Sequence, residues 1–499
     1  MKVRHRALAA AAISGLVAGL GFACGGESGN PTASTPDGGR IVAHDPNDPN
    51  YLPPVVVSRT PVDGDGQVSV RAPIEVKFSK QVQLGAVPAT VLVGDTPIAV
   101  ASTLSSNKFT LRITPVESIV APATVTVNLG DISDFQGRGL EPKPSWSWTV
   151  PLWLSASETL NAMPYLGGAL APGAGGNTYA AVIGAAGVTV FTVHSASRRW
   201  TKLGDTMPIG PGRFGLHSQV ALAVGKDGAP LIARVEPNLG IRVRRWSGAT
   251  WNDLGDAFGG ARAGEQLFAF TVDALGRPLL AYTPYSASRT DIFVQVFENG
   301  AWSMLGNGTL NDPSEFATSP SIALDKSGVP YIFFASNNGS PTRVNRARFL
   351  SGGTWKTLGS PFQVITGSAG RGNLTFDDAG NLFSMVTFED TDGKSHNQLF
   401  GFDGKDWAPI GAELPLGSTL LCFVRREHLL AFVRAPEGSP AKLRILDITR
   451  SGWTSSDVPP TASTGQNSMC DVDADGTPVM ASTPAWNQNG TVSLQRLNW

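Results

Sequence analysis

One hairpin pattern recurs many times in this sequence. The stretch "SIALDKSGVPYIFFAS", Ser321 to Ser336, is an apolar run, a turn marked by Asp, Lys, Ser and Gly, and a second apolar run. Near-copies read "TVDALGRPLLAY", "AVGKDGAPLIAR", "TFDDAGNLFSMV" and "DVDADGTPVMAS". Their turn glycines fall at 228, 276, 328, 380 and 476, which are spaced by 48, 52, 52 and 96 residues. The last gap is twice 48, and its midpoint, His428 in "FVRREHLLAF", marks a degenerate copy.

A second marker has the same period. The pattern W-x-x-L-G, or a close variant, begins at Trp200, Trp251, Trp302, Trp355 and Trp407. A degenerate copy begins at Trp453. Two unrelated markers that share a period of about 50 residues indicate a true internal repeat. We expect the repeated Trp to pack between repeats as core, because a large aromatic ring stabilises most when it is buried. The alternative is that the Trp rings form a cage around a ligand.

Each repeat is expected to contain four short strands, A to D, with the D-x-x-G turn between A and B and with Trp at the start of D. This is the pattern of a β-propeller blade, and kelch-like propellers have blades of this length. The B strands are apolar on both faces, as strands between stacked sheets must be. Seven blades are predicted, with B strands near 178–183, 230–234, 278–282, 330–335, 382–388, 429–433 and 478–482.

The last blade lacks its outer strand. The chain ends in "TVSLQRLNW", which matches strand C of the third blade. An open sheet edge favours aggregation, so we expect "VPLWLSAS" with Trp153, just before the first blade, to supply the missing strand. The alternative is that Trp499 is itself the seventh strand-D Trp.

The first residues resemble an export signal. "MKVRHRALAAAAISGLVAGLGFAC" has a basic start, an apolar stretch and small residues before Cys24. With the Gly/Ser/Pro-rich segment that follows, this resembles a bacterial lipoprotein, which implies cleavage before Cys24, a lipid on its thiol and a flexible tether. The usual Leu three residues before the cysteine is replaced by Gly21. Ordinary signal-peptidase cleavage after Ala23 is therefore the alternative.

The next segment reads as a β-sandwich of about seven short strands. It carries an S-x-x-P-x-x-G opening at Ser58, the strand "VKFSK", a D-x-x-G turn at Asp134 and an aromatic strand "SWSWTV". These features resemble an SbsA-type bacterial Ig-like domain. The resemblance implies a spacer or presentation module and no catalytic activity.

The predicted organisation is thus an all-β protein: a signal peptide at 1–23, a tether at 24–50, an Ig-like domain at 51–150 and a propeller at 151–499. The composition agrees, with 57 Gly, 36 Pro and only 16% charged residues. The formal net charge is -1 and no cluster of Lys or Arg follows the signal. We therefore expect no nucleic-acid partner, and membrane attachment only through the lipid.

Candidates for metal binding and catalysis are few. Asp471, Asp473 and Asp475 alternate before Gly476 as in a Ca²⁺ loop, but neither the twelfth nor the ninth position holds the acid that such loops use. A solvated hairpin turn is the alternative. The hairpins lack the Thr-Trp that follows the glycine in the Asp-boxes of sialidase-like propellers, and G-x-S-x-G and H-E-x-x-H do not occur. No cofactor is indicated.

Loop lengths point to one face of the propeller. The A–B and C–D turns are tight, whereas the B–C loops on the opposite face are long and varied, and function concentrates in variable loops on a rigid scaffold. These loops carry aromatic, Asn, Arg and His side chains that suit sugars or partner proteins. The ligand-binding candidates are Tyr285, Arg289, Asn337, Asn338, His396, Trp486 and Asn487. Exposed polar loops without a ligand are the alternative.

Two cysteines remain after Cys24. Cys422 and Cys470 each lie on strand A, six residues before His428 and Gly476, and so occupy equivalent places in neighbouring blades. Export to an oxidising compartment permits a disulfide between them, if their Cα atoms lie within about 7 Å. Two buried free thiols are the alternative.

The sequence favours a lipid-anchored envelope protein, at the outer membrane or cell surface, that binds a glycan or protein ligand without catalysis. An extracellular glycan-active hydrolase or lyase, with acids at the mouth of the propeller channel, is the first alternative. A purely structural envelope component is the second.

Overall fold

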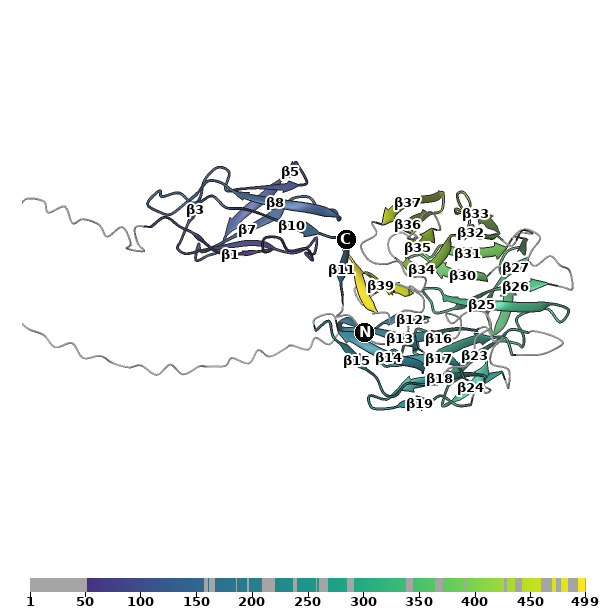
Figure 1. Cartoon of the computed structure of the whole chain (residues 1–499). Helices are drawn as coiled ribbons and strands as arrows, with labels where there is room; N and C mark the ends of the chain where they lie inside the picture. The colour runs from purple at the N-terminus through teal and green to yellow at the C-terminus, as the bar shows by residue number, and fades with distance from the viewer. Residues whose placement is uncertain are drawn as a thin grey trace, which may run out of the picture. The chain divides into compact units, whose positions relative to one another are not determined.

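The structure is a computed structural model of the chain (Figure 1). It describes residues 52–156, 160, 167–184, 186–194, 197–208, 220–236, 240–256, 258–259, 268–284, 291–337, 344–363, 371–389, 392, 394–425, 429–435, 442–458, 469–472, 477–482 and 492–498. By internal contacts the chain separates into residues 1–53 and 54–499. Within the described residues every regular element is a strand, apart from one 3-10 turn, η1 (Ala174–Gly176).

The Ig-like domain is a sandwich of two four-stranded antiparallel sheets, ordered β1-β2-β7-β6 and β10-β8-β4-β5, with the short pair β3 and β9 beside them. Its strands are β1 (Val56–Thr60), β2 (Ile74–Phe78), β3 (Gln83–Leu84), β4 (Ala89–Val93), β5 (Thr96–Ile98), β6 (Val100–Leu104), β7 (Thr110–Pro115), β8 (Ala123–Leu129), β9 (Ile132–Ser133) and β10 (Ser145–Val150). The sequence predicted about seven, because strands of two or three residues are too short to show alternation.

The motifs used to predict this domain hold it together. Alternate residues of the inner faces, such as Val76, Val127 and Trp148, form one buried core. The Trp146 ring N–H donates to the carbonyl of Pro61 at 3.0 Å, and Gly64 N–H donates to Ser147 O at 2.8 Å. The S-x-x-P-x-x-G opening is therefore tied to the aromatic closing strand.

Residues 153–497 form seven four-stranded antiparallel sheets, as the repeat predicted; two of them have an additional short strand. Blades 1 to 3 consist of β12 (Gly167–Pro172), β13 (Asn177–Gly184), β14 (Gly187–His194) and β15 (Trp200–Lys202); β16 (Val220–Val224), β17 (Pro230–Glu236), β18 (Gly240–Trp246) and β19 (Trp251–Asp253), with β20 (Phe258–Gly259) on β18; and β21 (Phe268–Val272), β22 (Pro278–Tyr282), β23 (Phe293–Glu298) and β24 (Ala301–Met304).

Blades 4 to 6 consist of β25 (Phe316–Leu324), β26 (Pro330–Asn337), β27 (Val344–Ser351) and β28 (Thr354–Thr357), with β29 (Phe362–Gln363) on β27; β30 (Arg371–Phe376), β31 (Leu382–Glu389), β32 (Ser395–Phe402) and β33 (Trp407–Pro409); and β34 (Thr419–Arg425), β35 (Leu429–Ala435), β36 (Lys442–Thr449) and β37 (Gly452–Val458). Blade 7 consists of β38 (Met469–Val472), β39 (Pro478–Ser482), β40 (Ser493–Leu497) and β11 (Trp153–Ser155). The predicted B strands coincide with β13, β17, β22, β26, β31, β35 and β39.

The ring closes by strand exchange, as predicted. β11 pairs antiparallel with β40, with Trp153 opposite Leu497, so the segment before blade 1 supplies the outer strand of blade 7. Figure 1 shows blue β11 against the yellow C-terminal strands. Residues of blades 7 and 1, among them Val479, Leu494 and Ala180, share one buried cluster. Trp153 therefore takes the strand-D place, and Trp499 lies outside the described residues.

The acid of the D-x-x-G turn is structural. Asp273 Oδ1 accepts the backbone N–H groups of Leu275 at 3.0 Å and Arg277 at 2.8 Å. Asp325 does the same for Ser327 and Val329, at 2.8 and 2.9 Å. A short acidic side chain that bonds the backbone ahead of it stabilises such turns, which explains the recurrent Asp.

The W-x-x-L-G motif joins several successive blades. The ring N–H of Trp355 donates to the carbonyl of Leu305, in the motif of the preceding blade, at 2.9 Å. The glycine of that preceding motif, Gly306, has φ of +85°, and a Cβ there would lie 2.5 Å from Trp355 Nε1. Equivalent bonds run from Trp251 to Leu203, Trp302 to Leu254 and Trp407 to Leu358. Trp453 donates instead to the carbonyl of Ala412, the residue after the motif glycine of blade 5. The Trp rings pack between blades, as expected.

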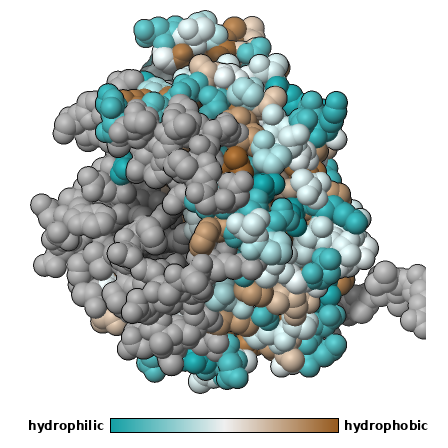
Figure 2. Space-filling model, turned by 90° about the vertical axis from the view of Figure 1, so that its right-hand side faces the viewer, coloured by the Kyte–Doolittle hydropathy of each residue, from teal (hydrophilic) through white to brown (hydrophobic). Residues whose placement is uncertain are grey.

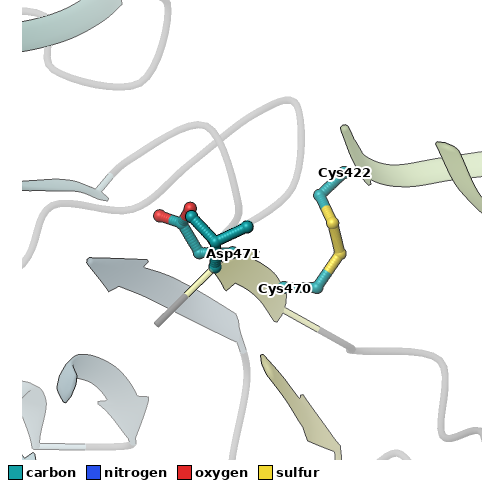
Figure 3. Close-up of a disulfide and its surroundings, with 4 residues drawn as sticks. Cys422, Cys470 and Asp471 are labelled. Carbon is teal, nitrogen blue, oxygen red and sulfur yellow. A yellow bond between two sulfur atoms is a disulfide. The ribbon is translucent and has the colours of Figure 1, made fainter. Parts of the chain in front are cut away.

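The interface between blades 6 and 7 differs. In blade 6 the motif reads W-T-S-S-D from Trp453, without Leu-Gly. Trp153 is buried there, and its ring N–H has no hydrogen-bond partner in the structure. The same interface holds a disulfide between Cys422 of β34 and Cys470 of β38, with Cα atoms 5.7 Å apart (Figure 3).

Candidate functional site

Only two of the loop candidates lie within the described part of the chain. Asn337 ends strand β26 of blade 4, and His396 is the second residue of β32 in blade 5. Both stand at the B–C end of their blades, but within strands rather than in the loops to which the sequence assigned them. The other candidates lie outside the described residues: Tyr285, Arg289, Asn338, Trp486 and Asn487. Cys24, Asp473 and Asp475 also lie outside them.

His396 is engaged by its surroundings. Its ring stacks on Phe388, with ring centroids 5.1 Å apart, and its Nδ1 pairs with the Glu413 carboxylate. Asn337 differs, because its side-chain oxygen is buried and makes no hydrogen bond in the structure. Of the two, Asn337 alone has a buried acceptor without a donor.

The weak Ca²⁺ candidate retains one described member, Asp471 on inner strand β38. In Figure 3 its carboxylate points away from the disulfide. No group of three or more His, Cys, Asp or Glu side chains suited to a metal occurs among the residues that the structure describes. Nor does that part of the chain contain a helix long and apolar enough to cross a membrane.

A pocket of about 530 Å³ opens on the tight-turn face, at blades 1 and 2. It lies at the A–B and C–D turns of blade 2, opposite the loop face favoured by the sequence. Blade 1 contributes one aromatic side chain and blade 2 contributes the rest. The residues with side chains suited to recognition are Tyr179, Asp227, Arg245, Trp246, Ser247 and Asn252.

The pocket arises where blade 2 departs from the repeat. Its turn reads G-K-D-G, so Gly225 replaces the structural Asp and Asp227 occupies the third position instead. There Asp227 forms an ion pair with Arg245 of β18, and both side chains are about half exposed, at 53% and 41%. The third position is Leu275 in blade 3 and Ser327 in blade 4. This ion pair is therefore not part of the repeat pattern.

Two aromatic residues flank the ion pair. The Tyr179 hydroxyl donates to Gly228 O at 3.1 Å, which ties blade 1 to the turn of blade 2. Trp246 packs against the strand-D Trp251, with ring centroids 5.3 Å apart, and part of its surface remains exposed at the pocket.

The electrostatics keep the pocket charged at neutral pH. Burial alone would raise the pKa of Asp227, but the hydrogen bond and attraction of Arg245 outweigh it and hold that pKa below its ordinary value. Burial, together with the nearby Asp227 charge, raises the pKa of Tyr179, so its hydroxyl stays protonated. The pocket thus presents a carboxylate, a guanidinium, hydroxyls and an amide beside an aromatic ring.

Sequence reasoning missed this pocket. The signal was present in the G-K-D-G turn, the one near-copy of the hairpin quoted above that lacks an Asp three residues before its glycine. Where described residues are visible in Figure 2, hydrophobic areas are small and separated by hydrophilic ones. The described part of this face therefore shows no broad apolar docking area.

Comparison with known proteins identifies the N-terminal domain. Residues 51–150 match the family model of a bacterial Ig-like domain. No curated protein matches the chain.

Solved structures similar to this chain include a polysaccharide lyase, a PL25 ulvan lyase, at 10% identity and TM-score 0.49, covering 69% of this chain and 95% of that one. The lectin SapL1 in complex with α-methyl fucoside matches at 15% identity and TM-score 0.38, covering 60% and 99%. An endo-arabinase from Bacteroides thetaiotaomicron matches at 17% identity and TM-score 0.33, covering 49% and 98%.

Proposed function

We propose that this protein is a lipid-anchored envelope protein whose propeller binds a neutral glycan, without catalysis, in the pocket of blade 2. The observation that carries the proposal is the Asp227–Arg245 pair beside Trp246 in a pocket of about 530 Å³. Sugars present apolar C–H faces that stack on aromatic rings, and hydroxyls that bond to planar polar groups. The pocket contains both kinds of group.

The departure from the repeat supports a functional reading. The D-x-x-G turns of blades 3 and 4 use their Asp for two backbone hydrogen bonds, whereas Asp227 in blade 2 accepts a single one, from Ala229 N–H at 3.3 Å. A charged pair at an open pocket adds little stability, because surface ion pairs are worth about 0 to 1 kcal/mol. Recognition of a ligand gives this pair a role beyond the single backbone contact of Asp227 and the small stability of an exposed ion pair.

A glycan array followed by calorimetry tests the proposal. The purified protein should bind a subset of neutral glycans, and Trp246→Ala should weaken binding at least about tenfold by removing the stacking surface. Phe297→Ala is the matched control, because Phe297 holds the same register place beside the strand-D Trp302 of blade 3. Equal losses in both variants, or binding only to a protein partner, would contradict a glycan site here.

Asp471 favours a second function, the glycan-active enzyme. Burial raises the pKa of this inner-strand carboxyl to about 6, against the opposing effects of the Val472 N–H and Arg425. A raised pKa suits a general acid. Incubation with a bound glycan separates the two functions: unchanged glycan supports binding alone, and products that disappear in Asp471→Asn support the enzyme.

The envelope location rests on Cys24 and the signal before it. Replacing Cys24 with Ser should release the protein from the membrane fraction, because no thiol remains for the lipid. An alkyne-palmitate label should mark the wild type alone. Membrane association that persists in the Ser variant would instead favour ordinary signal-peptidase cleavage with another means of retention. In this arrangement the Ig-like domain acts as a spacer. We assign this domain to the SbsA type and the propeller to the kelch-like type.

A further inference from the structure

Blade 2 also departs from the repeat at its other end. Arg234 lies six residues after the turn glycine Gly228, and its side chain is fully buried, at 0% exposure. The equivalent positions in blades 3, 4 and 5 are Tyr282, Phe334 and Val386, all buried, whereas blade 6 has a partly exposed arginine, Arg434, six residues after His428. A fully buried cation thus occupies a place that blades 3 to 5 fill with apolar or aromatic side chains, which is costly unless the charge is used or compensated.

Arg234 belongs to a network with more cations than anions. Glu236 accepts from Arg234 through Oε1, and from Arg242 Nε through Oε2 at 2.7 Å. Asp253 accepts from Arg242 NH1 at 2.9 Å and from Arg244 Nε. Among the described residues, three guanidinium groups therefore share two carboxylates, which leaves one net positive charge.

The surplus charge is accessible at Arg244. Because Arg234 occupies the near oxygen of Glu236, Arg244 NH2 stays 3.9 Å from it, beyond hydrogen-bond distance. Arg242, by contrast, is bonded to both carboxylates. The Arg244 side chain is 25% exposed, whereas that of Arg234 is fully buried. Solvent therefore reaches the Arg244 side chain at the outer end of the network.

Blade 4 provides an internal comparison. Its Arg346 and Arg348 stand at the register places of Arg242 and Arg244. Arg346 pairs with Glu315, and Arg348 pairs with Asp312 at 3.0 Å. Two cations meet two anions there. The same R-x-R pattern is thus neutralised in blade 4 and left with a net charge in blade 2.

We propose that the Arg234–Arg242–Arg244 network is a second binding site, separate from the pocket, that takes an oxyanion such as the carboxylate or sulfate ester of an acidic polysaccharide. An arginine edge binds such groups through paired N–H donors. Two further observations agree. Burial and the neighbouring Arg244 and Arg242 lower the pKa of Arg234 to about 10, despite Glu236, so it stays protonated at neutral pH. Its Nε is buried without a hydrogen-bond partner in the structure.

Binding of polygalacturonate, dextran sulfate and neutral dextran, at one fixed ionic strength, tests this site and distinguishes the carboxylate from the sulfate source. The two anionic polymers, or one of them, should bind and dextran should not. Arg244→Gln should weaken that binding about tenfold, the effect of about 1.4 kcal/mol, and Arg346→Gln in blade 4 should not change it. The proposal is overturned if Arg244→Gln leaves polymer binding unchanged, or if Arg346→Gln weakens it equally.

Two more variants separate binding from folding. Asp253→Asn removes a competing carboxylate and should strengthen binding of the same polymer several-fold, although it weakens the network itself. Arg234→Met removes the surplus charge and should abolish binding while keeping the melting temperature equal or higher. Unchanged affinity in either variant would show that the network is structural only. Loss of neutral-glycan binding in Trp246→Ala with intact polyanion binding would confirm that the two sites, and the two proposals, are independent.

Discussion

The interface between blades 3 and 4 and the interface between blades 6 and 7 solve one packing problem in two ways. In the former, Trp355 donates to the Leu305 carbonyl and lies on Gly306. In the latter, Trp153 is equally buried, but the motif before it has lost its Leu-Gly and the ring N–H has no partner in the structure. That interface holds the disulfide of Cys422 and Cys470 instead.

The difference shows what the repeat motif does. The Leu and Gly of W-x-x-L-G serve the next blade rather than their own, since they provide the carbonyl and the close approach for the following Trp. Blade 6 can lose them only if its next interface is held otherwise. That interface also closes the ring with β11, a strand distant in sequence, whose pairing requires a long loop to close. A covalent link between neighbouring inner strands suits that place.

The largest expected effect comes from an interface of the first kind. Trp355→Ala should lower the free energy of unfolding by roughly 3 to 5 kcal/mol, because it leaves a cavity and an unpaired carbonyl between blades. Lys356→Ala, at the exposed neighbouring position, should cost under about 0.5 kcal/mol. Denaturant unfolding compares the two. Similar midpoints would mean that the Trp ring is not inter-blade core.

Removal of the disulfide is expected to have nearly as large an effect. The bond spans 48 residues, and the chain-entropy estimate for such a loop is about 4 kcal/mol. Reduction, or the double variant Cys422→Ala with Cys470→Ala, should lower the melting temperature of the exported protein. Mass spectrometry of a non-reduced digest should find the linked peptide. Two thiols that alkylate fully after unfolding would refute the bond.

These two interfaces also show how far the sequence could lead. Periodic markers predicted the seven blades, the seven B strands, the closure by the Trp153 strand and the equivalent places of Cys422 and Cys470, because a repeat transfers position from one copy to the next. The Ig-like domain followed from its motifs. The Trp-to-carbonyl bonds were not predicted, since they depend on which backbone group faces the ring.

The candidate sites were harder to predict for a related reason. Loop length directed attention to the B–C face, whereas the pocket lies at turns where one Asp has moved by two positions in G-K-D-G. The arginine network joins β17, β18 and β19, and its net charge appears only when the ion pairs are counted in space. Both features are exceptions to the repeat, so a search for the repeat passes over them.

The carboxyl of Asp471, which follows Cys470 in β38, should give the stability of the fold a pH dependence. The folded-state pKa of Asp471, about 6, lies above its ordinary value of 3.8. The stabilising effect of protonation is therefore fully present below about pH 4 and is lost as the pH rises through about 6. Asp471→Asn should be more stable than wild type by up to about 3 kcal/mol at about pH 8, and this advantage should vanish near about pH 4. A constant difference across that range would contradict the raised pKa.

The smallest expected effect is the sharpest test of the comparison. Phe in place of Trp keeps most of the buried ring and removes only the N–H donor and part of the surface. Trp355→Phe should therefore leave the Leu305 carbonyl without its donor, at a cost of about 1 kcal/mol beyond the lost packing. Trp153→Phe breaks no hydrogen bond and removes a buried donor that has no partner in the structure, so it should cost less. Denaturant unfolding of both variants with the disulfide intact measures the difference. Equal costs, or a larger cost for Trp153→Phe, would show that the ring N–H bond contributes nothing to joining the blades and that the lost Leu-Gly of blade 6 needed no replacement.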